Sequence, residues 1–426
     1  MLNIIYDATQ IVSGETDNNS RCGIYVTSFN ILNELLKRDD VSVLLWTTSN
    51  KSYLVESLRL KYFPKAKNYY NERKISKLLF KLALNIKDVA KRKQKHFFIR
   101  KVIWLAFFVV DFLNSCASYQ RNGSLVNDEN TVFFSPLTAA PWYFERRKSL
   151  KKYIVLYDVI PYKLQSYNSQ IKSGWFGNLV KKLNPSDYYF SISQATKKDF
   201  CDEFPRLKEE NVWVVYLAAS NSFKQNEDVE AVRRVKAKYK LPSNKYIFSL
   251  CTLEPRKNLI RAVKTFLEFV QKNRINDLVW IMGGAQWNRF SEIIKNEISN
   301  AELFDEHVFY AGYIDDGDLP ILYANAEWFV YTSQYEGFGL PPLEAMQCGC
   351  PVITSNNSSL PEVVGDAGVM IDWDSDEQHI DAYEKYYFNN DFREECRRKG
   401  LERAKMFSWE KTVNKMIDII GGCDSF

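Results

Sequence analysis

The feature that most constrains the fold is an alternation of short apolar runs with longer amphipathic stretches, which continues along almost the whole chain. Short apolar runs are typical of buried strands in a parallel sheet, and the stretches between them are typical of the helices that connect such strands. The apolar run at 3–6, for example, precedes an amphipathic stretch from about 23 to 37. The alternation predicts an α/β chain built on doubly wound parallel sheets.

The alternation is interrupted by a polar stretch that follows residues 220–223. A chain of 426 residues is too long for one ordinary core and is expected to form two domains of roughly 150 to 220 residues each. We therefore expect two Rossmann-like domains, 1–222 and 223–407, which face each other across a cleft and bind ligands at the carboxyl ends of their strands. The expected strands are 3–6, 41–46, 131–134, 153–157, 188–192 and 212–216, then 246–250, 279–282, 308–310, 329–331, 351–353 and 369–371.

Composition and charge exclude several classes of function. The chain has 46% hydrophobic and 26% charged residues, which is typical of a folded globular protein, and its net charge of +5 is too small to indicate nucleic-acid binding. The eight cysteines include no Cys-x-x-Cys pair, and the three histidines are far apart without carboxylate neighbours at ligand spacing. We therefore expect no metal site, and no cofactor besides a bound substrate.

One segment of the first half is strongly basic. Residues 73–101 contain eleven Lys or Arg and one acid, Asp88, interleaved with apolar side chains, and an apolar run of nine residues follows at 102–110. That run is far shorter than the roughly 20 residues that span a bilayer, but a basic amphipathic segment can lie on an anionic leaflet. The alternative is a solvated helix face packed on the sheet. Because the N-terminus has no signal peptide, we expect a cytoplasmic protein, peripheral on the inner face of the plasma membrane.

The most informative stretch is 335–346, Tyr-Glu-Gly-Phe-Gly-Leu-Pro-Pro-Leu-Glu-Ala-Met, which follows an expected strand. Its two prolines suit the first turn of a helix, so the amides of the preceding turn would lie at a helix N-terminus, where an anion or a sugar hydroxyl is favoured. Glu336 and Glu344 flank the turn with seven residues between them, and such a pair can accept hydrogen bonds from the diols of a ribose or a hexose. The alternative is a strand, turn and helix with incidental acids. The turn residues are Gly337, Phe338, Gly339 and Leu340.

The second informative stretch is 252–258, Thr-Leu-Glu-Pro-Arg-Lys-Asn, which follows the strand expected at 246–250. Arg256 and Lys257 are adjacent cations at the start of an expected helix. Such a pair can bind a diphosphate and neutralise its charge as it leaves. Arg256 can instead pair with Glu254, so both interpretations stay open.

Both stretches resemble glycosyltransferase family 4, retaining enzymes of the GT-B fold, and the chain resembles bacterial mannosyltransferases of surface-polysaccharide assembly. The hallmark of the family is a Glu-x7-Glu motif, which Glu336 and Glu344 match. The resemblance implies that Glu336 contacts the transferred sugar, Glu344 the nucleotide ribose, and Lys257 the donor phosphates. It also implies that a final helix, at 408–426 and with Ser408 as a possible N-cap, crosses back onto the first domain.

Further donor-binding residues follow from the resemblance. In relatives, two strand ends border the nucleotide base, and the resemblance places Gly283 and Tyr313 at the corresponding strand ends of this chain. Trp287 follows the first of these strands and is either a base contact or a lid or core aromatic. Gly23 matches a glycine that lets the backbone approach the donor diphosphate, with a plain turn as the alternative. Asp316-Gly317-Asp318 resembles the acid-x-acid metal motif of the other glycosyltransferase fold, but we expect a polar surface loop there.

One segment departs from the family. Residues 156–161, Leu-Tyr-Asp-Val-Ile-Pro, resemble the family's His-Asp-x-Ile-Pro segment, which faces the acceptor, but Tyr157 stands where a histidine is common. A tyrosine, with an ordinary pKa near 10, cannot replace a protonated imidazole at neutral pH. Asp158 remains as a candidate catalytic group that orients or contacts the acceptor.

The resemblance implies transfer of a hexose from a nucleoside-diphosphate sugar with retention of configuration. Because no residue is an obvious covalent nucleophile, we expect same-face attack, in which the departing phosphate oxygen takes the acceptor proton. GDP-mannose is the favoured donor, a UDP- or dTDP-sugar the next, and a polyprenyl-diphosphate-linked glycan the expected acceptor. The competing functions are a nucleotide-sugar epimerase, a phosphorylase, and a non-catalytic partner subunit that binds sugar or membrane.

Overall fold

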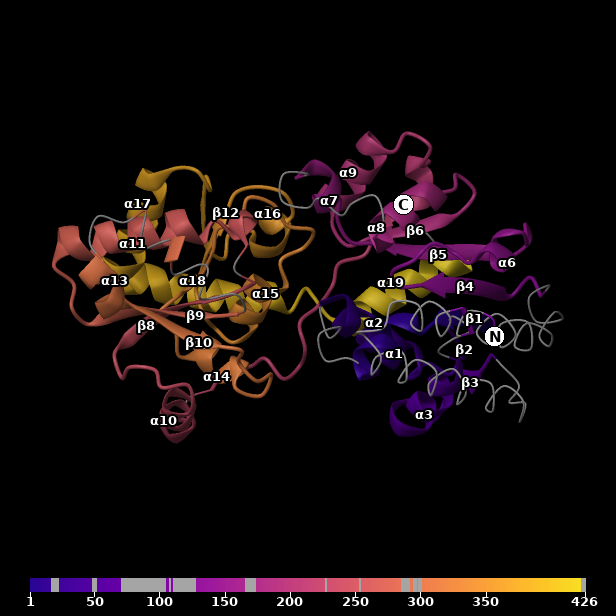
Figure 1. Ribbon diagram of the computed structural model, residues 1–426, viewed down its shortest axis with the longest axis horizontal. Helices are drawn as coiled ribbons and strands as arrows, with labels where there is room; N and C mark the ends of the chain where they lie inside the picture. Colours follow the sequence, from indigo (N-terminus) through magenta and orange to yellow (C-terminus); the bar gives the residue numbers. More distant parts are fainter. Residues whose placement is uncertain are drawn as a thin grey trace. The chain divides into compact units, whose positions relative to one another are not determined.

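The computed structural model contains two parallel β-sheets, one in each half of the chain (Figure 1). It describes residues 1–16, 23–47, 52–69, 105–106, 109, 128–164, 174–226, 228–252, 254–284, 292–293, 297 and 301–422. The contacts divide the chain into two compact units. The first unit is Met1–Leu156, Ser173–Phe190 and Arg206–Val212, and the second unit is Tyr157–Lys172, Ser191–Pro205 and Trp213–Phe426. The domain limits 1–222 and 223–407 stay a prediction.

The first sheet has seven strands in the order β3-β2-β1-β4-β5-β6-β7. Its strands are β1 Leu2–Asp7, β2 Val41–Trp46, β3 Lys67–Asn68, β4 Thr131–Ser135, β5 Lys151–Leu156, β6 Tyr188–Ser191 and β7 Val212–Val214. β1 lies parallel to both neighbours, with Ile4 beside Val43 of β2 and Val132 of β4. Because β2 and β3 follow on one side of β1 and β4 to β7 on the other, the winding direction changes between β1 and β4.

Apolar spacing explains the second of the two helices that lie between β1 and β2. The helix predicted at about 23–37 is present as α2, Gly23–Leu35, and its buried residues include Ile31, Leu32 and Leu35. These residues recur at helical spacing, so they form one apolar stripe. The other helices of the first half of the chain are α1 Thr9–Thr16, α3 Ser52–Tyr62, α6 Trp142–Glu145, α7 Ile160–Lys163, α8 Trp175–Lys182 and α9 Gln194–Glu203, of which α7 and α9 belong to the second unit.

The second sheet has six strands in the order β10-β9-β8-β11-β12-β13. Its strands are β8 Lys245–Leu250, β9 Leu278–Gly283, β10 Val308–Gly312, β11 Phe329–Tyr331, β12 Val352–Ser355 and β13 Val369–Ile371. The pairings between these neighbours are parallel. The winding direction changes between β8 and β11, where Phe329 lies beside Phe248. This is the position at which open α/β sheets form a ligand-binding crevice.

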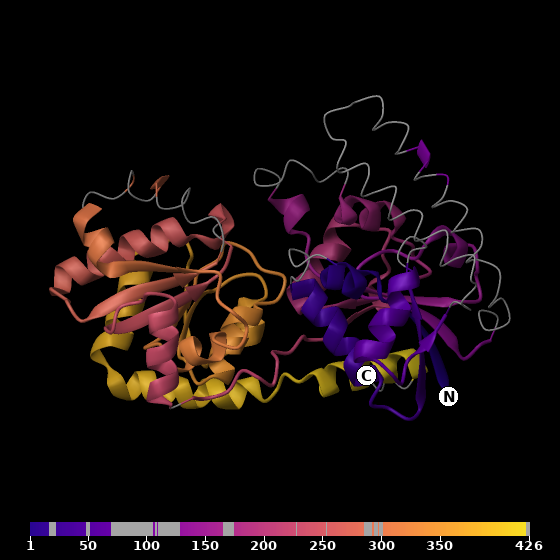
Figure 2. The ribbon, with the colours of Figure 1, turned by 60° about the horizontal axis from the view of Figure 1, so that its bottom comes forward.

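Helices cover both faces of the second sheet, as two views of the molecule show (Figures 1 and 2). Helices α11 and α13, which follow β8 and β9, lie on one face together with α17, whereas α14 and α15 lie on the other. The helices of this region are α10 Val229–Lys238, α11 Leu259–Asn273, α13 Ala301–His307, α14 Leu319–Ala324, α15 Leu340–Gln347, α16 Leu360–Val364, α17 Asp376–Phe388, α18 Asn390–Ala404 and α19 Trp409–Gly421.

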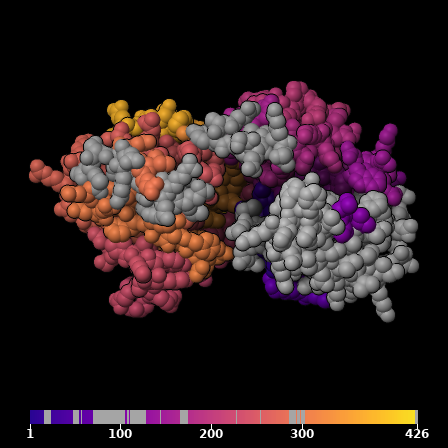
Figure 3. Space-filling view, in the orientation of Figure 1, coloured from indigo at the N-terminus to yellow at the C-terminus, as the bar shows by residue number. Residues whose placement is uncertain are grey.

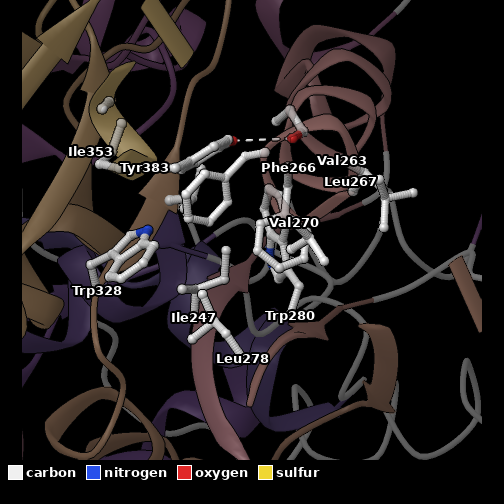
Figure 4. Packing of buried hydrophobic residues seen from close by; sticks show 14 of the residues in the cluster. Ile247, Val263, Phe266, Leu267, Val270, Leu278, Trp280, Trp328, Ile353 and Tyr383 are labelled. Atoms are coloured by element: carbon white, nitrogen blue, oxygen red, sulfur yellow. Dashed lines mark hydrogen bonds between the residues drawn. The ribbon is translucent and has the colours of Figure 1, made fainter. Parts of the chain in front are cut away.

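The core of the second sheet combines large aromatic side chains with aliphatic ones (Figure 4). Phe266 of α11 packs edge-on against Trp280 of β9, with ring centroids 5.2 Å apart. The Tyr383 hydroxyl donates to the Ala262 carbonyl oxygen at 3.0 Å, so the polar atom of this buried ring is satisfied. Burial of each such side chain contributes about 2–3 kcal/mol. This packing stabilises the strands of the second sheet and fixes the positions of their ends.

The C-terminal helix begins as the sequence predicts. The Ser408 hydroxyl accepts a hydrogen bond from the Lys411 amide at 3.2 Å, which confirms Ser408 as the N-cap of α19. Thr412 of this helix donates to the Tyr216 carbonyl oxygen at 2.6 Å. In the part of the chain that the structure describes, no helix is both long enough and apolar enough to cross a membrane.

Candidate functional site

The candidate site lies where β8 and β11 end, at the change of winding direction in the second sheet. The segment after β8 forms a short 3-10 helix, Pro255–Lys257, and leads into α11. The segment after β11 runs through a glycine-containing turn into α15. A main-chain hydrogen bond joins the two segments, because the Gln334 amide donates to the Arg256 carbonyl oxygen at 2.8 Å. The two motifs predicted from the sequence therefore form one site.

Glu336 is the centre of this site and has two cationic partners. Its Oε1 accepts from Lys257 Nζ at 2.5 Å and from Arg256 Nη1 at 2.9 Å. Both Glu336 and Lys257 are buried. Burial by itself raises the pKa of Glu336, but Lys257 and then Arg256 outweigh it and hold this pKa below its ordinary value. Glu336 is therefore an ionised carboxylate between two cations.

Arg256 has two acidic neighbours, as the sequence allowed. Its Nη1 donates to Glu336 at 2.9 Å and to the Tyr335 carbonyl oxygen at 2.7 Å. Its Nη2 lies 3.5 Å from the carboxylate of Glu254, whose side chain is 46% exposed. The buried contact with Glu336 is the shorter one, so Arg256 is oriented mainly by Glu336 and the backbone.

Two further groups shape the surroundings of Glu336, and sequence reasoning missed both. The Tyr331 hydroxyl, at the end of β11, accepts from Lys257 Nζ at 2.6 Å. The Ser359 hydroxyl donates to the carbonyl oxygens of Glu336 at 3.0 Å and Phe338 at 2.7 Å. In the sequence Tyr331 is only a strand residue and Ser359 only a loop residue. Neither carries a motif that would have identified it.

The turn between the two glutamates requires its glycines. Gly339 has φ of 117°, in the left-handed region that favours glycine, and it caps α15. A Cβ at Gly337 would lie 2.4 Å from the Tyr157 carbonyl oxygen and 2.9 Å from Asp158 Cβ. As the motif predicted, Pro341 and Pro342 occupy the first turn of α15, which begins at Leu340. A role of the turn amides in donor binding stays a prediction.

Glu344 lies on α15 and has a different environment from that of Glu336. Its Oε2 accepts from the Tyr323 hydroxyl at 3.1 Å. Burial raises the pKa of Glu344 to about 7, and the negative charge of Asp316 adds to this effect, although the bond from Tyr323 opposes it. The two glutamates of the motif thus have pKa values shifted in opposite directions, since one is paired with cations and the other is buried beside a phenol.

Asp158 lies close to the turn, as the Gly337 geometry shows. Its Oδ1 accepts from the Ile160 amide at 3.0 Å, in the loop that leads into α7. Burial raises the pKa of Asp158 to about 6, while Arg256 lowers it and Glu336 raises it. The structure therefore brings Asp158 into the electrostatic environment of the predicted donor motif.

The remaining predicted donor residues lie on different elements of the structure. Gly283 ends β9, and a Cβ there would lie 2.6 Å from Ile314 Cδ1. Tyr313 follows β10 and is 77% exposed. Gly23 is the first residue of α2 in the first unit. Trp287 and the basic segment 73–101 lie among residues that the structure does not describe.

The acid-x-acid segment forms ion pairs within the protein. Asp318 Oδ2 accepts from Lys238 Nζ at 2.5 Å and from the Tyr239 hydroxyl at 2.9 Å. Lys238 ends α10, a helix on the surface of the second unit (Figure 3). Within the described ranges, no group of three or more His, Cys, Asp or Glu side chains could hold a metal ion. Asp318 is thus a partner of Lys238 in a surface loop.

Comparison with known sequences relates the second half of the chain to glycosyltransferases. Residues 232–403 match the family model for glycosyl transferases group 1, a range that includes Arg256, Lys257, Glu336 and Glu344. The chain is 33% identical over 242 residues to O-antigen chain mannosyltransferase B of Escherichia coli, which covers 57% of this chain and 62% of that protein. It is 29% identical over 299 residues to the serotype-specific mannosyltransferase WbdA of Escherichia coli, which covers 68% of this chain and 35% of that protein. The chain thus spans less than two thirds of either relative.

Comparison with solved structures shows the fold. The Anabaena protein Alr3699/HepE, in complex with UDP and glucose, matches with a TM-score of 0.62 at 14% identity over 99% of this chain and all of that one. Sucrose-phosphate synthase from Thermosynechococcus elongatus matches with a TM-score of 0.64 at 16% identity over 99% of both chains. WaaG, a glycosyltransferase involved in lipopolysaccharide biosynthesis, matches with a TM-score of 0.59 at 14% identity over 99% of this chain and 100% of that one. The chain has the GT-B fold of two Rossmann-like domains, and its residues 232–403 match the group 1 glycosyl transferase model.

Proposed function

We propose that the chain is a retaining glycosyltransferase that moves a hexose from a nucleoside-diphosphate sugar to a growing surface glycan. The observation that carries this proposal is the contact of Lys257 and Arg256 with Glu336 at the ends of β8 and β11. Two adjacent cations suit a diphosphate, and a fixed carboxylate suits the hydroxyls of a sugar. The group 1 domain at 232–403 contains all three residues.

The geometry supports a role for these groups in bond cleavage. The bond between the anomeric carbon and the diphosphate oxygen breaks, and a bond from the same carbon to the acceptor oxygen forms on the same face. The departing phosphate oxygen takes the acceptor proton, while Lys257 and Arg256 stabilise the negative charge that develops on the diphosphate. Glu336 faces the sugar ring and Glu344 the ribose in this proposal.

Asp158 is the group that we assign to the acceptor side. With a pKa raised to about 6, it is mostly ionised at neutral pH and can accept a hydrogen bond from an acceptor hydroxyl. Its closeness to Gly337 supports this assignment, because it links the 157–163 segment to the donor motif. Asp158 would orient the acceptor while the phosphate oxygen takes the proton.

The names of the relatives support mannose as the transferred sugar and a surface polysaccharide as the product. GDP-mannose is therefore the donor that we favour, with UDP- and dTDP-sugars next. A lipid-linked acceptor and a peripheral position on the inner face of the plasma membrane would suit the basic segment 73–101, which has eleven Lys or Arg and one acid.

A donor screen tests the proposal. The protein would be incubated with GDP-mannose and with UDP- and dTDP-sugars, and release of the nucleoside diphosphate would be measured. We expect turnover of one donor by the wild type and about a hundredfold less by Glu336→Gln, if both melt at the same temperature. A wild-type protein that neither binds nor cleaves any of these donors would instead be a non-catalytic subunit, and the proposed function would be wrong.

A further inference from the structure

Tyr331 contacts the predicted phosphate-binding lysine in two ways. Its hydroxyl accepts a hydrogen bond from Lys257 Nζ at 2.6 Å, and the ammonium nitrogen lies 4.7 Å from the centre of its ring. Tyr331 is 5% exposed and Lys257 is 9% exposed. Both contacts are therefore shielded from water, in an environment where such electrostatic interactions are strong.

The hydrogen-bonding capacity of Lys257 is only partly used within the protein. A lysine ammonium has three N–H donors. Among the described residues, Lys257 donates to Tyr331 at 2.6 Å and to Glu336 at 2.5 Å. The two acceptors lie on different elements, the end of β11 and the turn that follows it. They fix the ammonium group from two directions and leave one donor for a ligand.

Tyr331 is itself rigidly placed. It lies in β11 beside Thr354 of β12. Its ring stacks on Phe329 with centroids 6.0 Å apart and planes 19° apart. Burial raises the pKa of the Tyr331 phenol well above its ordinary value, so the hydroxyl stays protonated. The acceptor that Tyr331 offers to Lys257 is thus fixed in both position and charge.

We propose that Tyr331 is a positioning residue, which directs the remaining N–H of Lys257 toward the donor diphosphate. A lysine side chain is flexible and carries considerable rotamer entropy. An anchor that orders it before the donor binds removes that cost from the binding and reaction steps. This inference rests on the proposed function, because it needs a diphosphate as the ligand.

The first test is Tyr331→Phe, which keeps the ring and removes the hydroxyl. Loss of a hydrogen bond to a charged group commonly costs enough free energy to lower kcat/KM by about tenfold or more. The matched control is Tyr246→Phe in the neighbouring strand β8, which removes a buried hydroxyl that donates to the Leu322 carbonyl oxygen at 2.8 Å. The control should keep wild-type kinetics. Unchanged kcat/KM in Tyr331→Phe would overturn the inference.

A double-mutant cycle separates positioning from a general structural role. If Tyr331 acts through Lys257, Tyr331→Phe should have no further effect on kcat/KM in a Lys257→Met background. If Tyr331→Phe lowers kcat/KM by the same factor in the Lys257→Met background as in the wild type, the inference is overturned. Should Tyr331→Phe fail to fold, Tyr331→Met, which also lacks the hydroxyl, replaces it in the same cycle with the same expected outcome.

Binding of free GDP and UDP, measured by calorimetry, distinguishes failure of the inference from failure of the proposed function. We expect the wild type to bind one of these nucleotides and Tyr331→Phe to bind it about tenfold more weakly. Equal affinity in both proteins would contradict the positioning role but leave the proposed function intact. A wild type that binds neither nucleotide and cleaves no donor would contradict the proposed function itself.

Discussion

The two sheets can be compared at the point where each changes its winding direction. In the first sheet this point lies between β1 and β4, and the buried carboxylate of Asp7 ends β1. Asp7 accepts from the Thr9 amide at 3.0 Å, from Thr138 at 3.1 Å and from Ser135 at 3.3 Å. In the second sheet the point lies between β8 and β11, and the buried carboxylate of Glu336 follows β11.

The difference lies in the partners of the two carboxylates. Asp7 has neutral hydroxyl and amide donors, and burial raises its pKa despite these hydrogen bonds. Glu336 has Lys257 and Arg256, which hold its pKa low despite burial. The same topology thus places a carboxylate with neutral partners in one sheet and a carboxylate with two cationic partners in the other. The sheet topology determines where a binding site can form, and the side chains at that point determine whether it can bind a ligand.

The largest expected effect tests this contrast directly. Glu336→Gln removes a charge that faces the reacting sugar in the proposed mechanism, so kcat should fall about a hundredfold or more. Asp7→Asn is the matched control, because it removes a buried carboxylate charge at the equivalent point of the first sheet. It should keep kcat within a few-fold of wild type. Steady-state kinetics of both variants, after their melting temperatures have been compared, would show whether the contrast holds, and an equal loss in both would refute it.

The second prediction concerns the expected membrane partner of the first half of the chain. Replacing Lys91, Arg92, Lys93 and Lys95 together by Gln should weaken binding to anionic vesicles by about tenfold or more, because each basic residue near the surface contributes about 1 kcal/mol. Binding of the wild type should also fall as salt rises. Sedimentation with phosphatidylserine vesicles measures both. Unchanged binding would mean that 73–101 is an ordinary solvated face.

The third prediction separates the two glutamates within the second sheet. Glu344 should contact the ribose, a part of the donor that does not change during the reaction. Glu344→Gln should therefore raise the donor KM by about fivefold with little change in kcat, the signature of lost uniform binding. Measurement of both constants beside those of Glu336→Gln tests the assignment. If Glu344→Gln loses kcat while Glu336→Gln keeps it, the two roles are reversed.

The fourth prediction uses the raised pKa of Glu344. Burial raises this pKa from 4.5 to about 7, so the folded state binds more protons than the unfolded state between these values. The free energy of unfolding should therefore fall as pH rises from about 5 to about 8. Glu344→Gln should show a smaller fall over the same range. Urea denaturation at about pH 5 and about pH 8 measures the free energy of unfolding. An equal fall in the wild type and in Glu344→Gln would contradict the raised pKa.

The smallest expected effect is that of a chelator. Lys257 and Arg256 supply the positive charge for the diphosphate in the proposed mechanism, so activity should persist in excess EDTA. The assay is turnover of the identified donor before and after dialysis against EDTA. If EDTA abolishes turnover and added Mg²⁺ or Mn²⁺ restores it, the prediction is wrong. Asp316 and Asp318 would then be candidate metal ligands, despite the contact between Asp318 and Lys238.

Much of the fold could be predicted, because apolar runs identify buried strands directly. Each of the twelve expected strands overlaps a strand of the structure. The strand that sequence reasoning missed is β3, Lys67–Asn68, which is short and polar and therefore has no apolar run. Strand order was not predictable in detail, since the pairing of β8 with β11 depends on contacts between residues about eighty positions apart.

The site could be predicted in its motifs but not in its contacts. The spacing of Glu336 and Glu344 and the adjacent Arg256 and Lys257 were visible as two separate stretches. The sequence left Glu254 and the diphosphate as possible partners of Arg256, and its shortest ion pair, with Glu336, appears only once β8 lies beside β11. Tyr331 was not predictable, because its contact with Lys257 also depends on that strand order.

The main-chain hydrogen bond from Gln334 to Arg256 has a consequence for how such a site can diversify. Of the twenty residue types, only proline at position 334 lacks the N–H that makes this bond. This main-chain link is thus independent of the side chain at position 334, whereas the contacts of Arg256 with Tyr335 and Glu336 require the arginine itself. Under the proposed function, residues around the cations could therefore be exchanged while this link between the two segments stays in place. Under the same proposal, an engineer who wishes to change donor preference would mutate the periphery of the site and keep Arg256, Lys257 and Glu336.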